Sequence, residues 1–227
     1  MALKNKKITA PAKRILIVDD HPMMRTGLAQ LINHEPDLKV VAEADNAGQA
    51  IDAVAKQKFD LALLDISLPD KSGLELIKDL RSLRPELPIL VVSMHDELVY
   101  AERVLRAGGR GYIMKQEGGQ KFLTAIRQVL AGQVFVSDKM SARILEVFSG
   151  RQSDGFGSPV QKLSDREFEV FQFVGQGIGT RAIAEKLHLS IKTVEVHRAN
   201  IKEKLDLKTA TDLVRFAVRW LDAQGAH

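Results

Sequence analysis

The chain lacks cysteine altogether, and this absence removes several classes of chemistry. None of its 227 residues can supply a disulfide, a zinc–thiolate site or a thiol nucleophile. No apolar run reaches the roughly 18 residues that a membrane-spanning helix needs. The opening stretch "MALKNKKITAPAKR" has lysines but no apolar core after them, so it does not resemble a secretory signal. We therefore expect a cytoplasmic protein without a membrane partner.

The chain also lacks a strong positive charge where a nucleic-acid-binding protein would show one. Its formal net charge is +4, but residues 1–14 carry five Lys/Arg and no acid. Residues 163–227 carry ten Lys/Arg against nine Asp/Glu. A basic surface is the usual electrostatic footprint of nucleic-acid binding. Charge alone therefore does not predict DNA binding here, and motifs must carry that inference.

Short apolar runs alternate with helical patterns along the first half of the chain. Runs rich in Val, Ile and Leu, which predict buried parallel strands, lie at 14–18, 38–43, 60–64, 88–93 and 111–114. Segments with helical periodicity follow at 22–33, 47–57, 73–83, 97–107 and 119–131. Five successive βα units predict an α/β domain. We expect a doubly wound, five-stranded parallel sheet with helices on both faces.

The middle of the chain predicts a linker. Residues 137–150 have a pattern that favours a helix, whereas residues 151–162 lose apolar periodicity and gather Gly, Ser, Asp and Pro. The pattern after the linker is entirely helical. We therefore predict an α/β domain at 13–136, a linker with a helix at 137–162 and a small all-α domain at 163–227.

Helix-start signals divide the last domain into four helices. Ser164 stands three residues before Glu167, which predicts a capping box, and Ser190 and Thr209 are placed to cap later helices. A short helix at about 180–187 precedes the helix that Ser190 starts. The short helix, the tight turn and the longer helix form a helix-turn-helix pattern. The second helix of such a motif is able to enter a DNA major groove.

Polar side chains follow four of the predicted strands. Asp19 and Asp20 follow the first, Asp65 follows the third, Ser93 ends the fourth and Lys115 follows the fifth. The carboxyl ends of parallel strands meet at the edge where doubly wound sheets bind ligands, so we expect these groups to converge. Each one alone is more often a turn residue or a solvated charge. Together they predict a phosphoryl-transfer site, because clustered carboxylates favour Mg²⁺ and an aspartate can accept a phosphoryl group.

These residues stand in four stretches, "ILIVDDHPMMRTGL", "LLDISLPDKSGLEL", "VVSMHDE" and "GGRGYIMK". Together the stretches resemble the receiver domain of bacterial response regulators. The resemblance implies that Asp65 is phosphorylated by a sensor histidine kinase. It also implies that Asp19, Asp20 and Asp65 hold Mg²⁺ together with the main-chain carbonyl of Ser67.

The same resemblance assigns roles to three further residues. Ser93 and Tyr112 match the switch pair of the family, and Lys115 matches the lysine that contacts the phosphoryl group. A new dianion at Asp65 would recruit the Ser93 hydroxyl and the Lys115 ammonium. The Tyr112 ring would then swing inward, which would turn a local change of charge into a change of surface.

The exposed face of the second helix of the helix-turn-helix supplies the candidate DNA contacts. Phosphate contacts are expected from Lys192, Thr193, Arg198 and Lys202, and base contacts from Glu195, Val196 and Ala199. Mixed charges on a helix face are more often plain solvated surface, and Glu195 repels phosphate. The residues by themselves leave DNA binding and a solvated face equally open.

The stretch "LSDREFEVFQFVGQG…AIAEKLHLSIKTVEVHRANIKEKL" resembles the LuxR-type helix-turn-helix. Its pairing with a receiver is that of the NarL/FixJ class of response regulators. The resemblance implies double-stranded DNA as a partner and a homodimer after phosphorylation. Such a dimer addresses half-sites about one DNA turn apart, or a multiple of it. Glu195 often matches a Lys in the family, a difference that bears on operator preference and not on the fold.

These features predict a DNA-binding transcription regulator that depends on phosphorylation of Asp65. We expect no enzymatic activity beyond phosphorylation and dephosphorylation of the protein itself. One alternative is a regulator that does not depend on phosphorylation and uses its receiver as a dimerisation scaffold. Another is an aspartyl-phosphate hydrolase, but such enzymes commonly carry a second Asp two residues after the nucleophile, where this chain has Ser67.

Overall fold

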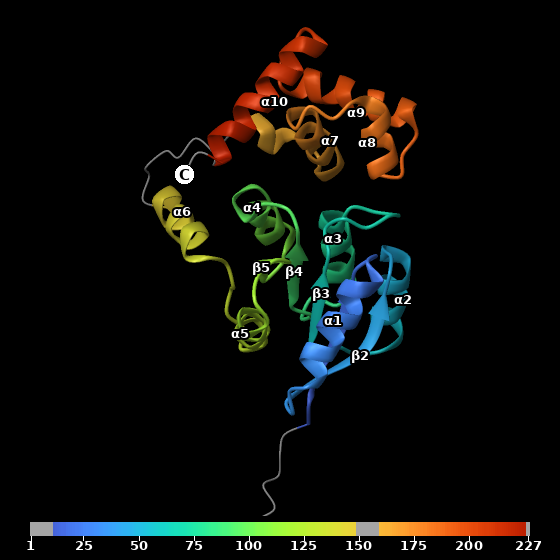
Figure 1. Ribbon diagram of the computed structural model, residues 1–227, viewed down its shortest axis with the longest axis vertical. Coiled ribbons are helices and arrows are strands. Elements are labelled where there is room, and N and C mark those ends of the chain that lie inside the picture. The colour runs from blue at the N-terminus through green and yellow to red at the C-terminus, as the bar shows by residue number, and fades with distance from the viewer. Residues whose placement is uncertain (1–10, 149–158, 226–227) are drawn as a thin grey trace, which may run out of the picture. The chain divides into compact units, whose positions relative to one another are not determined.

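The computed structural model describes residues 11–148 and 159–225 (Figure 1). The chain divides into two compact units, and each is considered by itself. The predicted linker falls partly outside the described residues: positions 149–158 are not described, whereas Pro159–Lys162 form a turn of 3₁₀ helix. No helix within the described ranges is long and apolar enough to cross a membrane.

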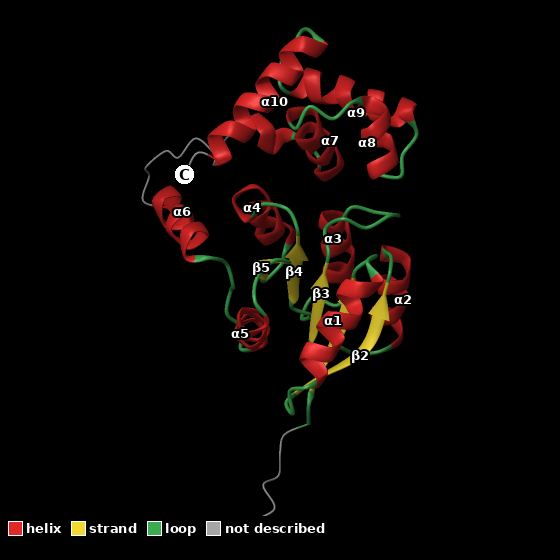
Figure 2. Cartoon of the chain, in the orientation of Figure 1, coloured by secondary structure: helices red, strands yellow, loops and turns green. Residues whose placement is uncertain are grey.

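The first unit is built on a five-stranded parallel sheet (Figure 2). The strands are β1 (Lys13–Val18), β2 (Leu38–Ala44), β3 (Leu61–Leu64), β4 (Ile89–Ser93) and β5 (Gly111–Met114). They lie in the order β2-β1-β3-β4-β5, and every neighbouring pair is parallel. All residues of β3 and β4 are buried, as expected for central strands that helices cover on both faces. The predicted fold class is confirmed.

Helices follow the strands in strict alternation. They are α1 (Pro22–Asn33), α2 (Ala47–Lys56), α3 (Gly73–Leu83), α4 (Glu97–Ala107) and α5 (Gly119–Leu130). The apolar sides of α1 and α5 share one core cluster with alternate residues of the strands. Helices α2 and α3 pack against each other on the opposite face of the sheet (Figure 1). This arrangement leaves the carboxyl ends of the strands open for polar groups.

Hydrogen bonds and close packing hold the loop from β3 to α3 in place. Near its end, the Asp70 carboxylate accepts hydrogen bonds from the backbone N–H groups of Ala47 and Gly48, at 2.9 and 3.0 Å, where α2 begins. At the loop's junction with α3, the Gly73 N–H donates to the carbonyl of Ile66 at 2.9 Å. A Cβ atom at Gly73 would lie 2.5 Å from the Ile66 Cα and 2.6 Å from the Asp65 carbonyl oxygen. Glycine is therefore required for the loop to close this tightly.

The second unit is helical, as predicted. Helix α6 (Asp138–Phe148) precedes the undescribed segment, and the other helices are α7 (Asp165–Gly175), α8 (Thr180–Lys186), α9 (Ile191–Lys204) and α10 (Ala210–Gly225). Helix α10 continues past the expected end near residue 221. His188 adopts a φ of 53°, a left-handed conformation that allows the tight turn between α8 and α9.

Aromatic packing and capping stabilise the second unit. The Trp220 ring on α10 lies 5.7 Å from the Phe168 ring and 5.6 Å from the Phe171 ring, both on α7 and both in edge-on geometry. The expected capping box is present at Ser164 and Glu167. The Glu167 carboxylate also accepts a 2.6 Å contact from the Lys204 ammonium at the end of α9. These contacts fix α9 against α7 and so set the orientation of the helix-turn-helix.

Candidate functional site

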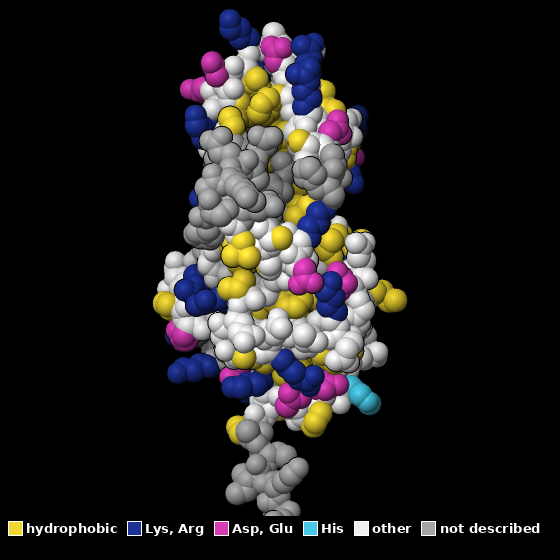
Figure 3. Space-filling model, turned by 90° about the vertical axis from the view of Figure 1, so that its left-hand side faces the viewer, with side chains coloured by type: hydrophobic (Ala, Val, Ile, Leu, Met, Phe, Trp, Pro, Cys, Tyr) yellow, Lys and Arg dark blue, Asp and Glu magenta, His cyan; other side chains and the backbone are white. Residues whose placement is uncertain are grey.

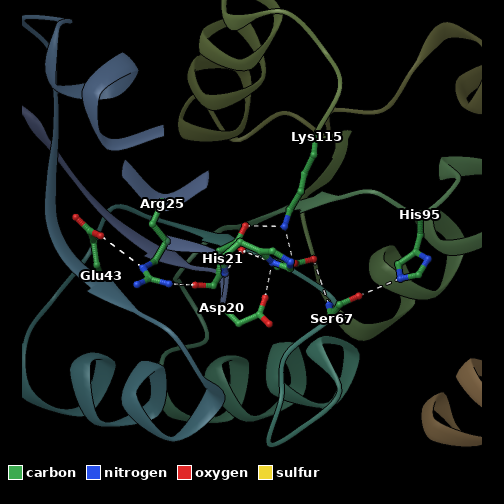
Figure 4. Close-up of polar contacts among 9 residues, drawn as sticks. Asp20, His21, Arg25, Glu43, Ser67, His95 and Lys115 are labelled. Atoms are coloured by element: carbon green, nitrogen blue, oxygen red, sulfur yellow. Dashed lines mark hydrogen bonds and ion pairs between the residues drawn. The ribbon is translucent and has the colours of Figure 1, made fainter. Parts of the chain in front are cut away.

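Acidic side chains converge at the carboxyl end of the sheet of the first unit (Figure 4). Asp19 and Asp20 follow β1, and Asp65 follows β3. Together with His21, they offer ligand atoms that all lie within 4.8 Å of one another. Asp19 and Asp65 are nearly inaccessible, at 2% and 3% exposure. The sequence predicts this convergence of the three acids, but it does not single out His21.

Lys115 joins the two buried acids. Its ammonium nitrogen lies 2.7 Å from Asp19 Oδ2 and 2.6 Å from Asp65 Oδ2, and its side chain is 4% exposed. Burial alone would lower the pKa of Lys115, but the charges and hydrogen bonds of Asp65 and Asp19 outweigh burial, and the pKa is raised. The lysine is therefore a fixed cation between two carboxylates, at the place where the sequence predicts a contact to a phosphoryl group.

Asp65 has an unusual pKa for an aspartate. Burial raises it from 3.8 to about 6, even though the Lys115 ammonium acts in the opposite direction, and the charge of Asp19 raises it further. The Ser67 N–H donates to Asp65 Oδ1 at 3.2 Å, which favours the ionised form. Asp65 thus combines a nucleophilic carboxylate with an adjacent cation, an arrangement suited to accepting a phosphoryl group.

The chemistry of the donor set suits a hard divalent cation. Carboxylate oxygens predominate, and oxygen-rich sites favour Mg²⁺ over softer metals. Two negative charges from Asp19 and Asp65 share the single Lys115 ammonium, and Asp20 adds a third. The site is therefore an acidic pocket with a net negative charge that a cation would reduce.

The backbone that carries these acids is held by a residue that the sequence does not single out. Arg25 on α1 donates from Nη1 to the carbonyl oxygen of Asp19 at 2.6 Å. Its Nε lies 3.6 Å from a carboxylate oxygen of Glu43 on β2 (Figure 4). A helical arginine four residues after His21 has no periodic signature that distinguishes it from a surface charge, so only the fold reveals this contact.

The two residues predicted to form the switch pair are both buried and both bonded to His95. Ser93 and Tyr112 have no solvent exposure. The His95 N–H donates to Ser93 Oγ at 3.1 Å, and the Tyr112 hydroxyl donates to the His95 carbonyl at 2.7 Å. The imidazole Nε2 lies 3.0 Å from Ser67 Oγ (Figure 4). Tyr112, which was expected to move inward after phosphorylation, already lies inside in this structure.

Helix α9 presents most of the predicted DNA-contact residues to solvent. Val194 and Ile201 are buried and attach the helix to its domain. The exposed residues of the predicted set are Lys192, Glu195, Val196 and Ala199. Lys202 is half-buried.

Two residues of the predicted set have structural partners. Thr193 takes part in capping α9: the N-cap residue Ser190 accepts a hydrogen bond at its Oγ from the Thr193 N–H at 3.0 Å. Arg198 donates from Nη1 to Thr180 Oγ1 at 3.2 Å and so ties α9 to the start of α8. Basic and acidic side chains are interspersed on the face that Figure 3 shows, as the near-balanced composition predicts. On α9 itself, Lys192 and Glu195 are both exposed and carry opposite charges, so any nucleic-acid contact depends on the shape of this helix more than on a patch of one charge.

Comparison with known proteins identifies both units. Residues 15–127 match the family described as "Response regulator receiver domain", and residues 161–217 match "Bacterial regulatory proteins, luxR family". The "Oxygen regulatory protein NreC" of Staphylococcus haemolyticus is 37% identical over 210 residues, which are 91% of this chain and 97% of that protein. The NreC protein of Staphylococcus aureus strain MRSA252 shows the same identity and coverage.

Solved structures show the same likeness. A LuxR-family two-component response regulator from Aurantimonas is 33% identical over 61% of this chain and 99% of that chain, with a TM-score of 0.57. RcsB from Salmonella enterica serovar Typhimurium, bound to the rprA promoter in the presence of the phosphomimetic BeF₃⁻, is 26% identical. That likeness covers 91% of this chain and 98% of that chain, with a TM-score of 0.61. The likeness to RcsB therefore extends over both units of this chain, whereas the likeness to the Aurantimonas protein covers 61% of it.

Proposed function

Since this chain belongs to the response regulators that join a receiver domain to a LuxR-type DNA-binding domain, we propose that it is a transcription regulator controlled by phosphorylation of Asp65. The observation that carries the proposal is the Lys115 ammonium held between Asp65 and Asp19 at the carboxyl end of the sheet. A sensor histidine kinase would supply the phosphoryl group. The protein would act on the chromosome in the cytoplasm, and its chemistry would be confined to its own Asp65.

The residues at the site divide the work of the transfer. An oxygen of the Asp65 carboxylate attacks the phosphorus, the bond from phosphorus to the donor breaks, and the donor leaves with the electron pair. Lys115 offers its ammonium to the transferred group, because it already lies 2.6 Å from Asp65 Oδ2. The Ser67 N–H orients the other Asp65 oxygen. Ser93 supplies a hydroxyl from the end of β4.

The acidic pocket would hold Mg²⁺ through Asp19, Asp20, Asp65 and the carbonyl of Ser67. When bound, the cation neutralises charge that builds up on the phosphoryl oxygens. The donor set supports this part of the proposal, since carboxylates from two strand ends lie within 4.8 Å of one another.

The output would be a change in self-association and in DNA binding. RcsB, which shares the domain order, has been solved as dimers on DNA, and also on promoters with the phosphomimetic BeF₃⁻. By analogy, a phosphorylated homodimer of this chain would place two copies of α9 in successive major grooves of double-stranded DNA.

The proposal is tested by treating the purified full-length protein with acetyl phosphate and Mg²⁺. We expect one labile phosphoryl adduct, on Asp65, together with more dimer in sedimentation and tighter binding to a DNA selected from random duplexes. Asp65→Ala should lose all three responses. Asp52→Ala, which removes an exposed acid on α2, is the matched control and should keep them.

Two results would count against the proposal. Uptake of phosphate by Asp65→Ala on another aspartate would overturn the site assignment. Equal DNA binding by treated wild type, untreated wild type and Asp65→Ala would instead support a regulator whose receiver acts only as a dimerisation scaffold.

A further inference from the structure

Two cavities lie at the amino end of the receiver's sheet, where the strands begin (the lower end of the sheet in Figure 1). The larger cavity, of about 380 Å³, is lined by Lys13 of β1 and by Arg110, which precedes β5. The smaller cavity, of about 270 Å³, is lined by Arg14 of β1. Three residues line both cavities, so the two adjoin: Phe59, Asp60 and Glu86.

These cavities gather positive charge that the receiver as a whole does not have. Residues 13–136 carry 16 Lys/Arg against 17 Asp/Glu. The walls of the two cavities hold six of these cations and only two of the acids. The cations are divided equally: Lys13, Arg81 and Arg110 line the larger cavity, and Arg14, Lys58 and Arg84 line the smaller one. Each cavity therefore presents three positive charges to a ligand.

Two of the arginines are held by neutral acceptors. Arg14 donates from Nε to the carbonyl of Lys58 at 3.1 Å and from Nη2 to Gln57 Oε1 at 2.7 Å. Arg81 donates from Nη1 to the carbonyl of Pro85. Neutral acceptors orient a guanidinium group without neutralising it, so its charge remains available to an anion.

Two further arginines have no acid beside them. Within residues 11–148 and 159–225, the Nε of Arg84 is buried and has no hydrogen-bond partner. Arg110 is exposed and forms no ion pair with any residue of the same ranges. A buried donor without an acceptor is unfavourable. An acceptor supplied by a ligand would therefore stabilise the site at Arg84.

The two acids of the walls differ in their contacts. Asp60 is engaged through both oxygens: Oδ2 accepts the Arg14 N–H at 2.8 Å, and Oδ1 lies 3.3 Å from Lys13 Nζ. Glu86 is exposed and has no cationic partner in the part of the chain that the structure describes. Only Glu86 therefore adds uncompensated negative charge to the shared wall.

We propose that the two cavities bind a ligand with at least two linked phosphate groups, one for each set of three cations. Guanidinium groups form strong, bidentate hydrogen bonds to phosphate. Phe59 is half-buried and offers an aromatic surface in the shared wall, so the diphosphate can belong to an inorganic ion or to a nucleotide. Asp65 lies at the opposite end of the sheet, and the proposal does not depend on its phosphorylation.

Calorimetric titration of the full-length protein with pyrophosphate in EDTA tests the proposal. EDTA removes divalent cations that would draw phosphate groups to the acidic pocket at Asp65. We expect saturable binding of one pyrophosphate per chain. Inorganic phosphate should bind more weakly, because it can occupy only one cavity, and equal affinity for the two ions would overturn the two-cavity site.

Titration with ADP and with adenosine identifies the source of the diphosphate. Tighter binding of ADP than of pyrophosphate would show that the wall at Phe59 receives a nucleoside, whereas equal or weaker binding would show that the site takes the inorganic ion. Adenosine, which has no phosphate, should not bind detectably. Binding of adenosine as tight as that of ADP would contradict a site built for phosphate.

Charge variants locate the ligand. Arg84→Gln and Arg110→Gln remove one cation from different cavities, and each should weaken pyrophosphate binding by about tenfold. Glu86→Gln removes the opposing acid and should tighten binding. Lys39→Ala, on β2, and Lys192→Ala, in the DNA-binding unit, are matched controls that should leave the affinity unchanged; both lysines are exposed.

Three results would overturn the proposal. One is the absence of saturable pyrophosphate binding by the wild-type protein. Another is binding that only Lys192→Ala weakens, because the anion would then occupy the DNA-binding unit. The third is an equal loss in Lys39→Ala and Arg84→Gln, which would indicate attraction to overall charge. Circular dichroism of the same samples confirms that each variant is folded.

Discussion

Asp65 keeps a carboxyl group in surroundings that oppose its charge. Its side chain is 3% exposed, and burial raises its pKa to about 6 in spite of the adjacent Lys115. An ordinary surface aspartate would be more stable in its ionised form. At this position the fold gives up stability to hold a nucleophile beside a fixed cation, as functional sites commonly do.

The raised pKa predicts how stability depends on pH when no metal is present. Between about pH 4 and 6 the folded protein binds the proton of Asp65 more tightly than the unfolded chain does. The contribution of this residue to stability therefore falls as the pH rises through that window. Asp65→Asn removes the ionisation and leaves Lys115 paired with Asp19.

We expect Asp65→Asn to match wild type near pH 4 and to exceed it above pH 6 by up to about 3 kcal/mol. Urea unfolding in EDTA, followed by circular dichroism at several pH values, measures this difference. Titrating groups that do not contact Asp65 cancel between the two proteins. A variant that is no more stable than wild type at pH 7.5 would contradict the raised pKa.

At the scale of single residues, the sequence predicts groups at strand ends better than groups on loops and helices. Asp19, Asp20, Asp65 and Lys115 converge as expected, because strand register alone places them at one edge. The bridging role of His95 depends on the path of a loop, which no periodicity encodes. The contacts of Arg25 and Arg198 were missed because each looks like an ordinary charge on a helix.

At the scale of elements, the junction of the β3–α3 loop with α3 restricts the sequence that the receiver can carry. Gly73 begins α3 directly against the backbone of Asp65 and Ile66. Gly27 lies in α1 and would meet nothing within 4 Å if it gained a Cβ. The same substitution should therefore have opposite effects at these two positions.

We expect Gly73→Ala to cost about 1–3 kcal/mol, because the added methyl forces the loop backbone apart. Gly27→Ala should stabilise the protein by about 0.5–1 kcal/mol, because alanine loses less conformational entropy in a helix. Gly73→Ala should also slow labelling of Asp65 by acetyl phosphate. Thermal unfolding and the labelling rate check both variants, and equal stability of the two would contradict the close packing at Gly73.

Elements were predicted more closely than the contacts between them. The strands and helices of the receiver begin and end within one residue of their expected positions, because alternating βα units combine short apolar runs with distinct turn residues. The caps at Ser164 and Ser190 were recognisable from local spacing. The length of α10 was underestimated: the helix reaches Gly225, which is the first residue after Leu221 that could mark a stop.

At the scale of the whole molecule, phosphoryl chemistry and DNA recognition lie in separate units of one chain. Their combination was predictable because each unit carries its own motifs. The affinity of the DNA-binding unit for the phosphate backbone of DNA was not predictable from net charge. The exposed face of α9 mixes Lys192 with Glu195, so attraction and repulsion toward phosphate oppose each other there.

Lys192 provides a test of the expected mode of DNA binding. Replacing it with alanine should weaken binding to all sequences and reduce the dependence of the affinity on salt. The slope of log K against log salt should fall in magnitude by about 0.9 for each bound subunit. Lys39→Ala, which removes an exposed lysine on β2, should leave the slope unchanged. An unaltered slope in Lys192→Ala would exclude this lysine as a phosphate contact.

Trp220 is the only tryptophan of the chain, and it packs edge-on against two phenylalanine rings of α7. When the indole is excited selectively, the fluorescence of the intact protein therefore reports on the DNA-binding unit alone. Melting of that half can be followed without labels and without cutting the chain. Any change in that emission on adding phosphodonor would show that phosphorylation of the receiver alters the surroundings of Trp220 in the DNA-binding unit.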